Sequence, residues 1–310
     1  MTPLQRYIAE EIATDHVDGL LSRREALRRL ALLGVGTAAA TSLIAACSGN
    51  KKPTSEAPAT STGAVTASQP ATASPQAPGS DTALPTAPVT WAGPQGELAG
   101  AWVEAPKARG GVLVIHENKG LNDWVRSVAG RFAGIGYSAL AIDLLSPQGG
   151  TAKFTDPAEA TAALGNIGNE EFVANLKSGV GELQRRVPGK KVAAVGFCMG
   201  GGLVWRLLAA GSPELAAAVP FYGPAPDNPN FAGSKDVAVL GFYGALDDRV
   251  NKTEPTARAA LEKAGLAHEL VTEPDANHAF FNDTNADRYN APAAQDAWRR
   301  VQDWFGRYLV

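Results

Sequence analysis

Cysteine and histidine are scarce in this chain, which has two cysteines and four histidines among its 310 residues. The two cysteines, Cys47 and Cys198, are too few to form a disulfide framework. No group of cysteines or histidines has the spacing of a zinc site. We therefore expect no metal and no cofactor, and each cysteine needs its own explanation.

An excess of positive charge is also lacking. The chain has 28 basic and 31 acidic residues, a formal net charge of −3, and no basic block outside its N-terminal segment. Nucleic-acid binding needs a concentrated basic surface for the phosphates, so we expect no nucleic-acid partner. The composition, 45% hydrophobic and 19% charged, is that of a globular protein with one sizeable core.

A hydrophobic run of the length that spans a membrane is missing too. The uncharged run Ala31–Ala46 has 16 residues, whereas a membrane-spanning helix needs about 20. This run follows a twin arginine, Arg23 and Arg24, and ends in Ile44–Cys47, which resembles the lipobox of bacterial lipoproteins. We interpret residues 1–46 as a twin-arginine export signal.

The lipobox resemblance implies that Cys47 is lipidated and anchors the protein to a membrane outside the cytoplasm. A plain cleaved signal that leaves Cys47 unmodified is the alternative. The first 21 residues form a longer lead-in than most signals carry, and the sequence does not account for them.

Large aliphatic and aromatic side chains are almost absent from residues 47–88, which consist mainly of Ala, Pro, Ser and Thr. Such a segment cannot bury enough apolar surface to fold. We predict a disordered tether here, followed by a monomeric folded domain over residues 89–310.

Within that domain, short apolar runs alternate with helical periods, which predicts an α/β fold with a mostly parallel, doubly wound sheet and helices on both faces. The expected strands are Leu98–Val103, Gly111–His116, Tyr137–Ile142, Lys191–Phe197, Ala216–Tyr222, Val237–Tyr243 and Glu269–Thr272. The expected helices are Asp123–Gly134, Glu170–Arg186, Met199–Ala210, Glu254–Ala264 and Ala291–Tyr308.

One strand and helix meet at a motif that carries chemistry. Between them stands the sequence Gly-Phe-Cys-Met-Gly, residues 196–200, which has the form of the nucleophile elbow G-x-S-x-G with cysteine in place of serine. The elbow presents Cys198 at the carboxyl edge of the sheet, where the helix N-terminus favours a thiolate. A small buried cysteine at a tight turn is the alternative interpretation.

An acid and a histidine follow in the order that α/β-hydrolases use. Asp247 and Asp248 come after the strand ending at Tyr243, and His278 comes after the strand ending near Thr272. Residues that follow parallel strands meet at one edge of the sheet. This order favours a Cys-His-Asp triad, in which either aspartate could orient the imidazole of His278.

Residues 89–310 resemble the dienelactone hydrolase family, also called carboxymethylenebutenolidases, which implies the α/β-hydrolase fold and hydrolysis of a small-molecule ester or lactone (EC 3.1.1). The resemblance rests on His116-Glu117 with Gly120-Leu121-Asn122, on Gly196-Phe197-Cys198-Met199-Gly200-Gly201, on Tyr243-Gly244 with Asp247-x-x-Val250, and on His278-Ala279-Phe280 leading to Arg288-Tyr289.

The resemblance also assigns roles to individual residues. Its D-x-x-V pattern selects Asp247 as the acid, and Glu117 matches a glutamate that holds the cysteine thiol at rest. A rim charge is the alternative interpretation of Glu117. The backbone N–H groups of Met199 and Asn118 are the expected oxyanion hole.

The sequence departs from the family at Asn282. Members that act on dienelactone have an arginine at this position, which grips the substrate carboxylate. Arg288 matches a helix-start feature of many relatives, so we expect a structural role for it. We therefore predict a preference for neutral esters or lactones over carboxylated ones.

Two other function classes stay open. A lipid-anchored binding protein can use a hydrolase scaffold without useful activity, and an exposed cysteine of low pKa can serve as a redox sensor. No second cysteine remains to resolve an oxidised Cys198 once Cys47 is acylated. Ester turnover by the folded domain discriminates hydrolysis from both.

Overall fold

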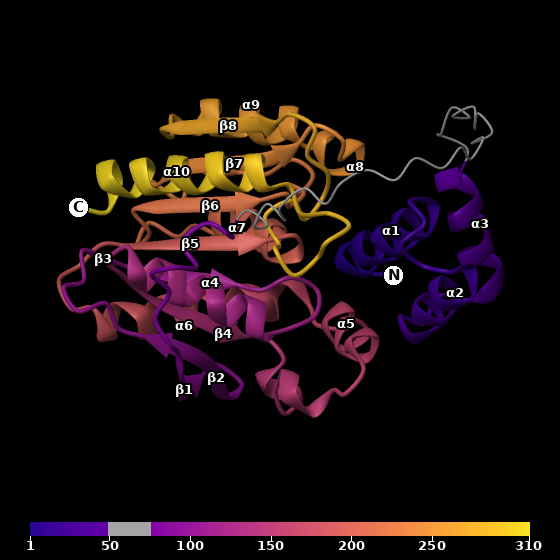
Figure 1. Cartoon of the computed structure of the whole chain (residues 1–310), viewed down its shortest axis with the longest axis horizontal. Helices are drawn as coiled ribbons and strands as arrows, with labels where there is room; N and C mark the ends of the chain where they lie inside the picture. The colour runs from indigo at the N-terminus through magenta and orange to yellow at the C-terminus, as the bar shows by residue number, and fades with distance from the viewer. Residues whose placement is uncertain (49–75) are drawn as a thin grey trace, which may run out of the picture.

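A computed structural model describes residues 1–48 and 76–310 of the chain. Most of the predicted tether falls on residues 49–75, outside the described residues. The described part consists of an eight-stranded sheet with helices on both faces, and of three N-terminal helices at one edge of that sheet (Figure 1). In these residues no helix is both long enough and apolar enough to cross a membrane.

The sheet has the strand order β1-β2-β4-β3-β5-β6-β7-β8. Strand β2 is antiparallel to β1 and to β4, and every other neighbouring pair is parallel. The strands β3 to β7 are buried along their whole length, as expected for parallel strands covered on both faces. The strands are β1 Ala87–Gly93, β2 Gly96–Val103, β3 Gly110–Ile115, β4 Tyr137–Asp143, β5 Val192–Phe197, β6 Ala217–Phe221, β7 Ala238–Gly244 and β8 His268–Glu273.

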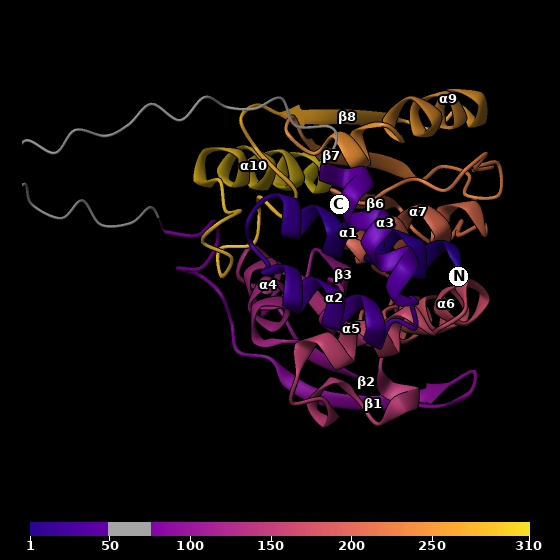
Figure 2. The same cartoon turned by 90° about the vertical axis from the view of Figure 1, so that its right-hand side faces the viewer.

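Helices α4 and α10 cover one face of the sheet, and α6 and α7 cover the other (Figures 1 and 2). Phe132 of α4 packs against Trp298 and Phe305 of α10 with tilted rings, which joins the two helices of the first layer. The helices of the domain are α4 Asp123–Gly134, α5 Pro157–Gly165, α6 Asn169–Arg186, α7 Met199–Ala209, α8 Asp248–Asn251, α9 Glu254–Ala264 and α10 Ala291–Tyr308, with short 3-10 turns at Ser146–Gln148 and Thr151–Lys153.

The predicted fold class is confirmed, and all seven predicted strands and five predicted helices are present within two residues of their expected ends. The edge strand β1 and the helix α5 were not predicted. The tether also ends before Pro88, because residues 76–86 already lie against α4: the backbone N–H of Leu84 donates to the carbonyl of Gly130. Gly130 has no side chain to block this approach.

The first 48 residues form helices α1 (Pro3–Val17), α2 (Arg23–Leu32) and α3 (Thr37–Ser48), which we call the N-terminal helices. A capping box between Thr2 and Gln5 starts α1, and the Ser22 side chain caps α2. The three helices share a buried apolar core that includes Ile8, Leu30 and Ile44. They lie across the edge of the sheet at which the parallel strands end (Figures 1 and 2).

Candidate active site

Cys198 occupies the sharp turn between β5 and α7 that its motif predicts. Its backbone has a φ of 55° and a ψ of −117°, a left-handed conformation that non-glycine residues rarely adopt. A Cβ on Gly200 would lie 2.4 Å from the carbonyl oxygen of Ile115, and one on Gly196 would lie 2.2 Å from that of Gly200. The glycines of the motif are therefore required by the close approach of β3, β5 and α7.

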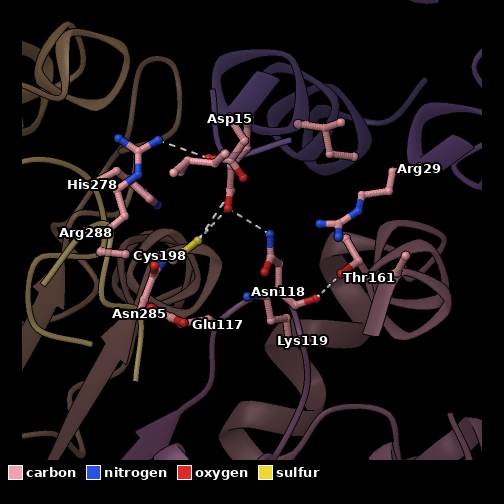
Figure 3. Close-up of a pocket in the computed structure, with 15 residues that line it drawn as sticks. Asp15, Arg29, Glu117, Asn118, Lys119, Thr161, Cys198, His278, Asn285 and Arg288 are labelled. Carbon is pink, nitrogen blue, oxygen red and sulfur yellow. Dashed lines mark hydrogen bonds and ion pairs between the residues drawn. The ribbon is translucent and has the colours of Figure 1, made fainter. Parts of the chain in front are cut away.

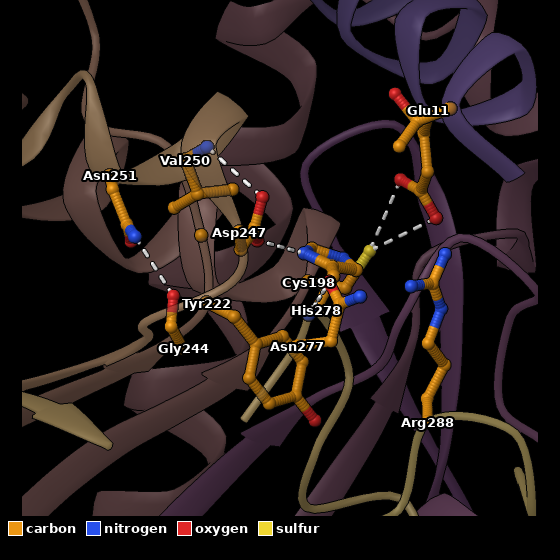
Figure 4. Close-up of polar contacts among 12 residues, drawn as sticks. Glu11, Cys198, Tyr222, Gly244, Asp247, Val250, Asn251, Asn277, His278 and Arg288 are labelled. Carbon is orange, nitrogen blue, oxygen red and sulfur yellow. Dashed lines mark hydrogen bonds and ion pairs between the residues drawn. The ribbon is translucent and has the colours of Figure 1, made fainter. Parts of the chain in front are cut away.

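Asp247 follows β7 and accepts a hydrogen bond from the imidazole of His278, with 2.6 Å between Oδ2 and Nδ1 (Figure 4). Its other oxygen caps α8 by accepting from the backbone N–H of Val250 at 3.2 Å. The two hydrogen bonds fix both carboxylate oxygens, which accounts for the aspartate of the D-x-x-V pattern. Asp248, the other candidate, is exposed as the first residue of α8.

The environment of the His278 imidazole favours its protonated form. Burial lowers its pKa, but the charge of Asp247 and the hydrogen bond that the ring donates to it outweigh burial, so the pKa is raised overall. The second ring nitrogen, Nε2, has no hydrogen-bond partner within the described part of the chain. One ring nitrogen of His278 lies within 4.8 Å of the Cys198 sulfur.

The thiol of Cys198 is covered by α1. Its sulfur lies 3.4 Å from Oε2 and 3.6 Å from Oε1 of Glu11, and 3.4 Å from the hydroxyl of Tyr7 (Figure 4). Burial raises the pKa of the thiol well above its ordinary value, and the charges of Glu11 and Glu117 raise it further. In this arrangement the thiol keeps its proton. The sequence analysis did not identify Tyr7 or Glu11 as site residues. The one sequence signal for them was the unexplained length of the first 21 residues, which precede the twin arginine.

Glu117 lies near the thiol but is hydrogen-bonded to other residues, so the role that the family resemblance gives it stays a prediction. Its Oε2 accepts from the side-chain amide of Asn282 at 2.8 Å, and its Oε1 accepts from the hydroxyl of Tyr222 at 3.5 Å. Among the described residues, the carboxylate that contacts Cys198 is that of Glu11. The two donors hold Glu117 away from the sulfur, and burial raises the pKa of its carboxyl group.

The two residues expected to form the oxyanion hole both flank the thiol. Met199 is buried as the first residue of α7, and Asn118 lies in the wall of the cavity beside Cys198. The carbonyl of Asn118 accepts from Thr161 at 2.8 Å, and its side-chain amide donates to Glu11 Oε1 at 2.8 Å (Figure 3). Their oxyanion role stays a prediction.

Arg288 lies in the wall of the same cavity and forms ion pairs with α1, and the structural role expected for it stays a prediction. Its Nη2 donates to Asp15 at 3.1 Å (Figure 3) and to Asp18 at 2.9 Å. Its side chain is 6% exposed. Helix α10 starts after Arg288 and is capped by Asn290, which leaves the guanidinium turned toward the site.

The cavity beside the thiol is small because the N-terminal helices fill it. Its volume is about 70 Å³, and its walls come from both parts of the chain: Glu11, Ile12 and Asp15 on one side, and Asn118, Cys198, His278 and Arg288 on the other. A larger hollow of about 790 Å³ opens between α1, α3 and α8. It reaches Asp247 and His278, but Cys198 is not in its walls.

Three side chains here are of types that bind metals. Glu11, Cys198 and His278 each offer one ligand atom within 4.8 Å of the others. A carboxylate, a thiolate and an imidazole suit a zinc ion. Since Glu11 belongs to α1, any such site would exist only while α1 covers the thiol.

Comparison with known proteins agrees with the fold. The model of the dienelactone hydrolase family matches residues 99–309. A protein of Escherichia coli O157:H7 assigned as a carboxymethylenebutenolidase is 33% identical over 234 residues, which cover 69% of this chain and 84% of the relative.

Two solved structures are similar as well. One is a protein of Klebsiella pneumoniae assigned as a dienelactone hydrolase, with a TM-score of 0.62 and 29% identity, covering 72% of this chain and 99% of that one. The other is a dienelactone hydrolase-like promiscuous phosphotriesterase from metagenomic libraries, with a TM-score of 0.63 and 26% identity, covering 73% of this chain and 100% of that one. In both, nearly the whole solved chain corresponds to part of this one.

The pairing of His278 with Asp247 predicts a measurable change in titration. Asp247→Asn should lower the pKa of the His278 imidazole, because the negative charge that favours imidazolium is removed while burial still opposes it. NMR titration of the ring protons measures this pKa. The matched control Asp248→Asn should leave it in place. The pairing is contradicted if the pKa of His278 falls in the control, or if it does not fall in Asp247→Asn.

Proposed function

Because the chain belongs to the dienelactone hydrolase family, and is therefore an ester or lactone hydrolase, we propose that Cys198, His278 and Asp247 act as its catalytic triad. The observation that carries this proposal is the meeting of two features at one edge of the sheet. Cys198 stands on a strained elbow, and the His278 ring, paired with Asp247, has a nitrogen within 4.8 Å of the sulfur.

The reaction begins with transfer of the thiol proton from Cys198 to Nε2 of His278, whose positive charge Asp247 stabilises. The thiolate attacks the carbonyl carbon, a C–S bond forms, and the carbonyl oxygen becomes an oxyanion. The backbone N–H groups of Met199 and Asn118 receive that charge. The intermediate then collapses, the C–O bond breaks, and the leaving alkoxide takes the proton from His278.

A thioester on Cys198 remains after the first half of the reaction. His278 removes a proton from a water molecule, and the resulting hydroxide attacks the thioester carbon. The C–S bond breaks, the carboxylic acid leaves, and the proton returns to the sulfur. For a lactone the alcohol and the acid remain in one molecule, so the product is a hydroxy acid.

Arg288 supports a carboxylate-bearing substrate. Its guanidinium is almost fully buried in the wall of the cavity beside Cys198 and binds the two carboxylates of Asp15 and Asp18. A buried guanidinium is a strong and specific partner for a carboxylate. This arrangement replaces the preference for neutral substrates that Asn282 suggested, since Arg288 supplies a cation from another position. The E. coli relative carries the name of an enzyme that acts on a carboxylated lactone.

The assignment of the nucleophile is tested on the chain shortened to residues 76–310, which contains the whole family match at residues 99–309. Cys198→Ala should abolish hydrolysis of aryl esters and lactones, since no other group can form the thioester. Stoichiometric alkylation of the wild-type thiol should have the same effect, measured by initial rates. Full turnover by Cys198→Ala would refute the assignment.

The role of Arg288 is tested by the ratio of two rate constants on the same shortened chain. Arg288→Gln should reduce kcat/KM for a carboxylated lactone by about 10-fold to 100-fold relative to an uncharged lactone of similar size, because charge-assisted hydrogen bonds contribute about 1.5–3 kcal/mol. A matched control is Arg126→Gln, on the solvent side of α4. If Arg288→Gln leaves the ratio of kcat/KM between the carboxylated and the uncharged lactone unchanged, Arg288 does not bind the substrate carboxylate.

Export and lipidation form the second part of the proposal. The support is the twin arginine at 23–24, both residues of which are exposed at the start of α2, together with the Ile44–Cys47 lipobox. In this proposal residues 1–46 are removed and the lipidated Cys47 anchors the enzyme to the outer side of a membrane.

Fractionation of a bacterium that has twin-arginine export tests this second part. The wild-type protein should reach the membrane fraction at the mass of a chain that starts at Cys47 and carries lipid. Cys47→Ser should be released or remain unprocessed, whereas the matched control Cys198→Ser should stay in the membrane. A full-length, unmodified wild-type protein in the cytoplasm is the result that rules out export.

A further inference from the structure

Helix α1 carries a row of acidic side chains that faces the active site. Glu11, Asp15 and Asp18 are spaced four and three residues apart, which places them on one face of the helix and of its C-terminal cap. Tyr7, one turn before Glu11, continues the same row. These positions lie in the lead-in that an export signal does not require.

Each member of this row contacts a group that the proposed reaction uses. Glu11 meets the Cys198 sulfur and the side-chain amide of Asn118, and Tyr7 also meets the sulfur. Asp15 and Asp18 both bind Arg288. The row therefore occupies the nucleophile and the carboxylate-binding cation at the same time.

Other contacts hold the N-terminal helices on the domain around the site. Arg28 of α2 forms an ion pair of 2.8 Å with Asp156, the residue that caps α5. Gln5 donates to Asn166 at 2.9 Å, also at α5. On the opposite side of the site, the guanidinium of Arg249 lies 4.4 Å from the centre of the Tyr7 ring.

We propose that α1 is a built-in inhibitor that occupies the substrate site while the chain retains its N-terminal helices. The cavity left beside Cys198 is about 70 Å³, whereas pockets for small molecules measure about 300–1,000 Å³. A substrate therefore cannot reach the sulfur until α1 withdraws. The inference rests on the proposed function for what the site does, but the covering of the thiol can be measured separately.

The charge of Glu11 adds to this physical block. Burial under α1 raises the pKa of the Cys198 thiol, and the Glu11 carboxylate beside the sulfur raises it further. Both therefore oppose formation of the thiolate. Removal of α1 takes away the Glu11 charge and restores contact with water. The same event opens the site and makes the nucleophile easier to ionise.

The inhibitor and the export signal share one continuous segment. Arg23 and Arg24 are exposed while α1 is in place, so the signal remains accessible on a folded, inactive enzyme. Cleavage before Cys47 would remove α1 together with the signal. The enzyme would then become active only after export.

The main experiment uses the full chain with a specific protease site inserted within residues 49–75. The uncut protein is compared with the cut protein after the N-terminal fragment has been washed away. Two rates are measured: alkylation of Cys198 by iodoacetamide, located by peptide mass spectrometry to distinguish it from Cys47, and hydrolysis of an aryl ester. Both should rise roughly tenfold to a hundredfold, because the fraction of open molecules sets both rates.

Point variants test the acidic row without cutting the chain. Asp15→Asn with Asp18→Asn should raise both rates in the full chain, because the ion pairs with Arg288 are lost. The matched control is Glu10→Gln, which removes the same type of charge from α1 but only breaks the pair with Arg6 on the helix itself. A synthetic peptide of residues 1–33 added to the cut protein should slow alkylation again.

The two readouts separate the inference from the proposed function. If alkylation of Cys198 is equally fast before and after removal of the fragment, α1 does not cover the site and the inference is overturned, whatever the esterase activity. If alkylation accelerates and the peptide reverses it, but no ester or lactone is hydrolysed, α1 does cover the thiol and the proposed function is wrong.

Discussion

The close approach of backbones at the elbow is the constraint on which the rest of the site depends. Gly196 and Gly200 let β3, β5 and α7 meet with no side chain between them, and this contact holds Cys198 in its left-handed conformation. The sulfur consequently stands above the edge of the sheet instead of lying in the core. Every other functional group is found where a strand ends near that point, on the loops after β3 and β7 and on the loop that follows β8.

A second constraint is electrostatic, since several ionisable groups share a nearly dry space. Burial raises the pKa of the Cys198 thiol and of the Glu117 carboxyl group, so each favours its neutral form. His278 behaves differently because Asp247 compensates burial at one ring nitrogen. The site therefore contains one group that readily becomes positive and a thiol that resists becoming negative, which is the charge distribution of a resting enzyme.

The sequence allowed the domain to be predicted well because the signals are local. Strand β5, the elbow and α7 follow each other directly, and the alternation of apolar runs was sufficient for the parallel strands. The choice of Asp247 over Asp248 needed the D-x-x-V pattern, whose aspartate caps α8 by accepting from the backbone N–H of Val250. Strand β1 was missed because its residues resemble the Pro-rich and Thr-rich segment that precedes them.

The contacts that sequence reasoning missed or misassigned depend on residues far apart in the chain. Glu11 and Cys198 are 187 positions apart, and Asp15 and Arg288 are 273 apart, so no spacing or periodicity relates them. Glu117 was assigned to the thiol by resemblance, but Asn282, 165 positions away, holds it elsewhere.

The complementarity between α1 and the site also bears on what the site binds. A chain that must fill its own substrate site is expected to use groups that resemble the substrate, because the same cation and the same dry walls select both. Three carboxylates in a row across Cys198 and Arg288 are poorly explained if the substrate is neutral and apolar, since an apolar helix face would then fit better. The acidity of α1 thus matches the positive charge of Arg288: the helix that closes the site has the charge of the ligand that the open site would accept.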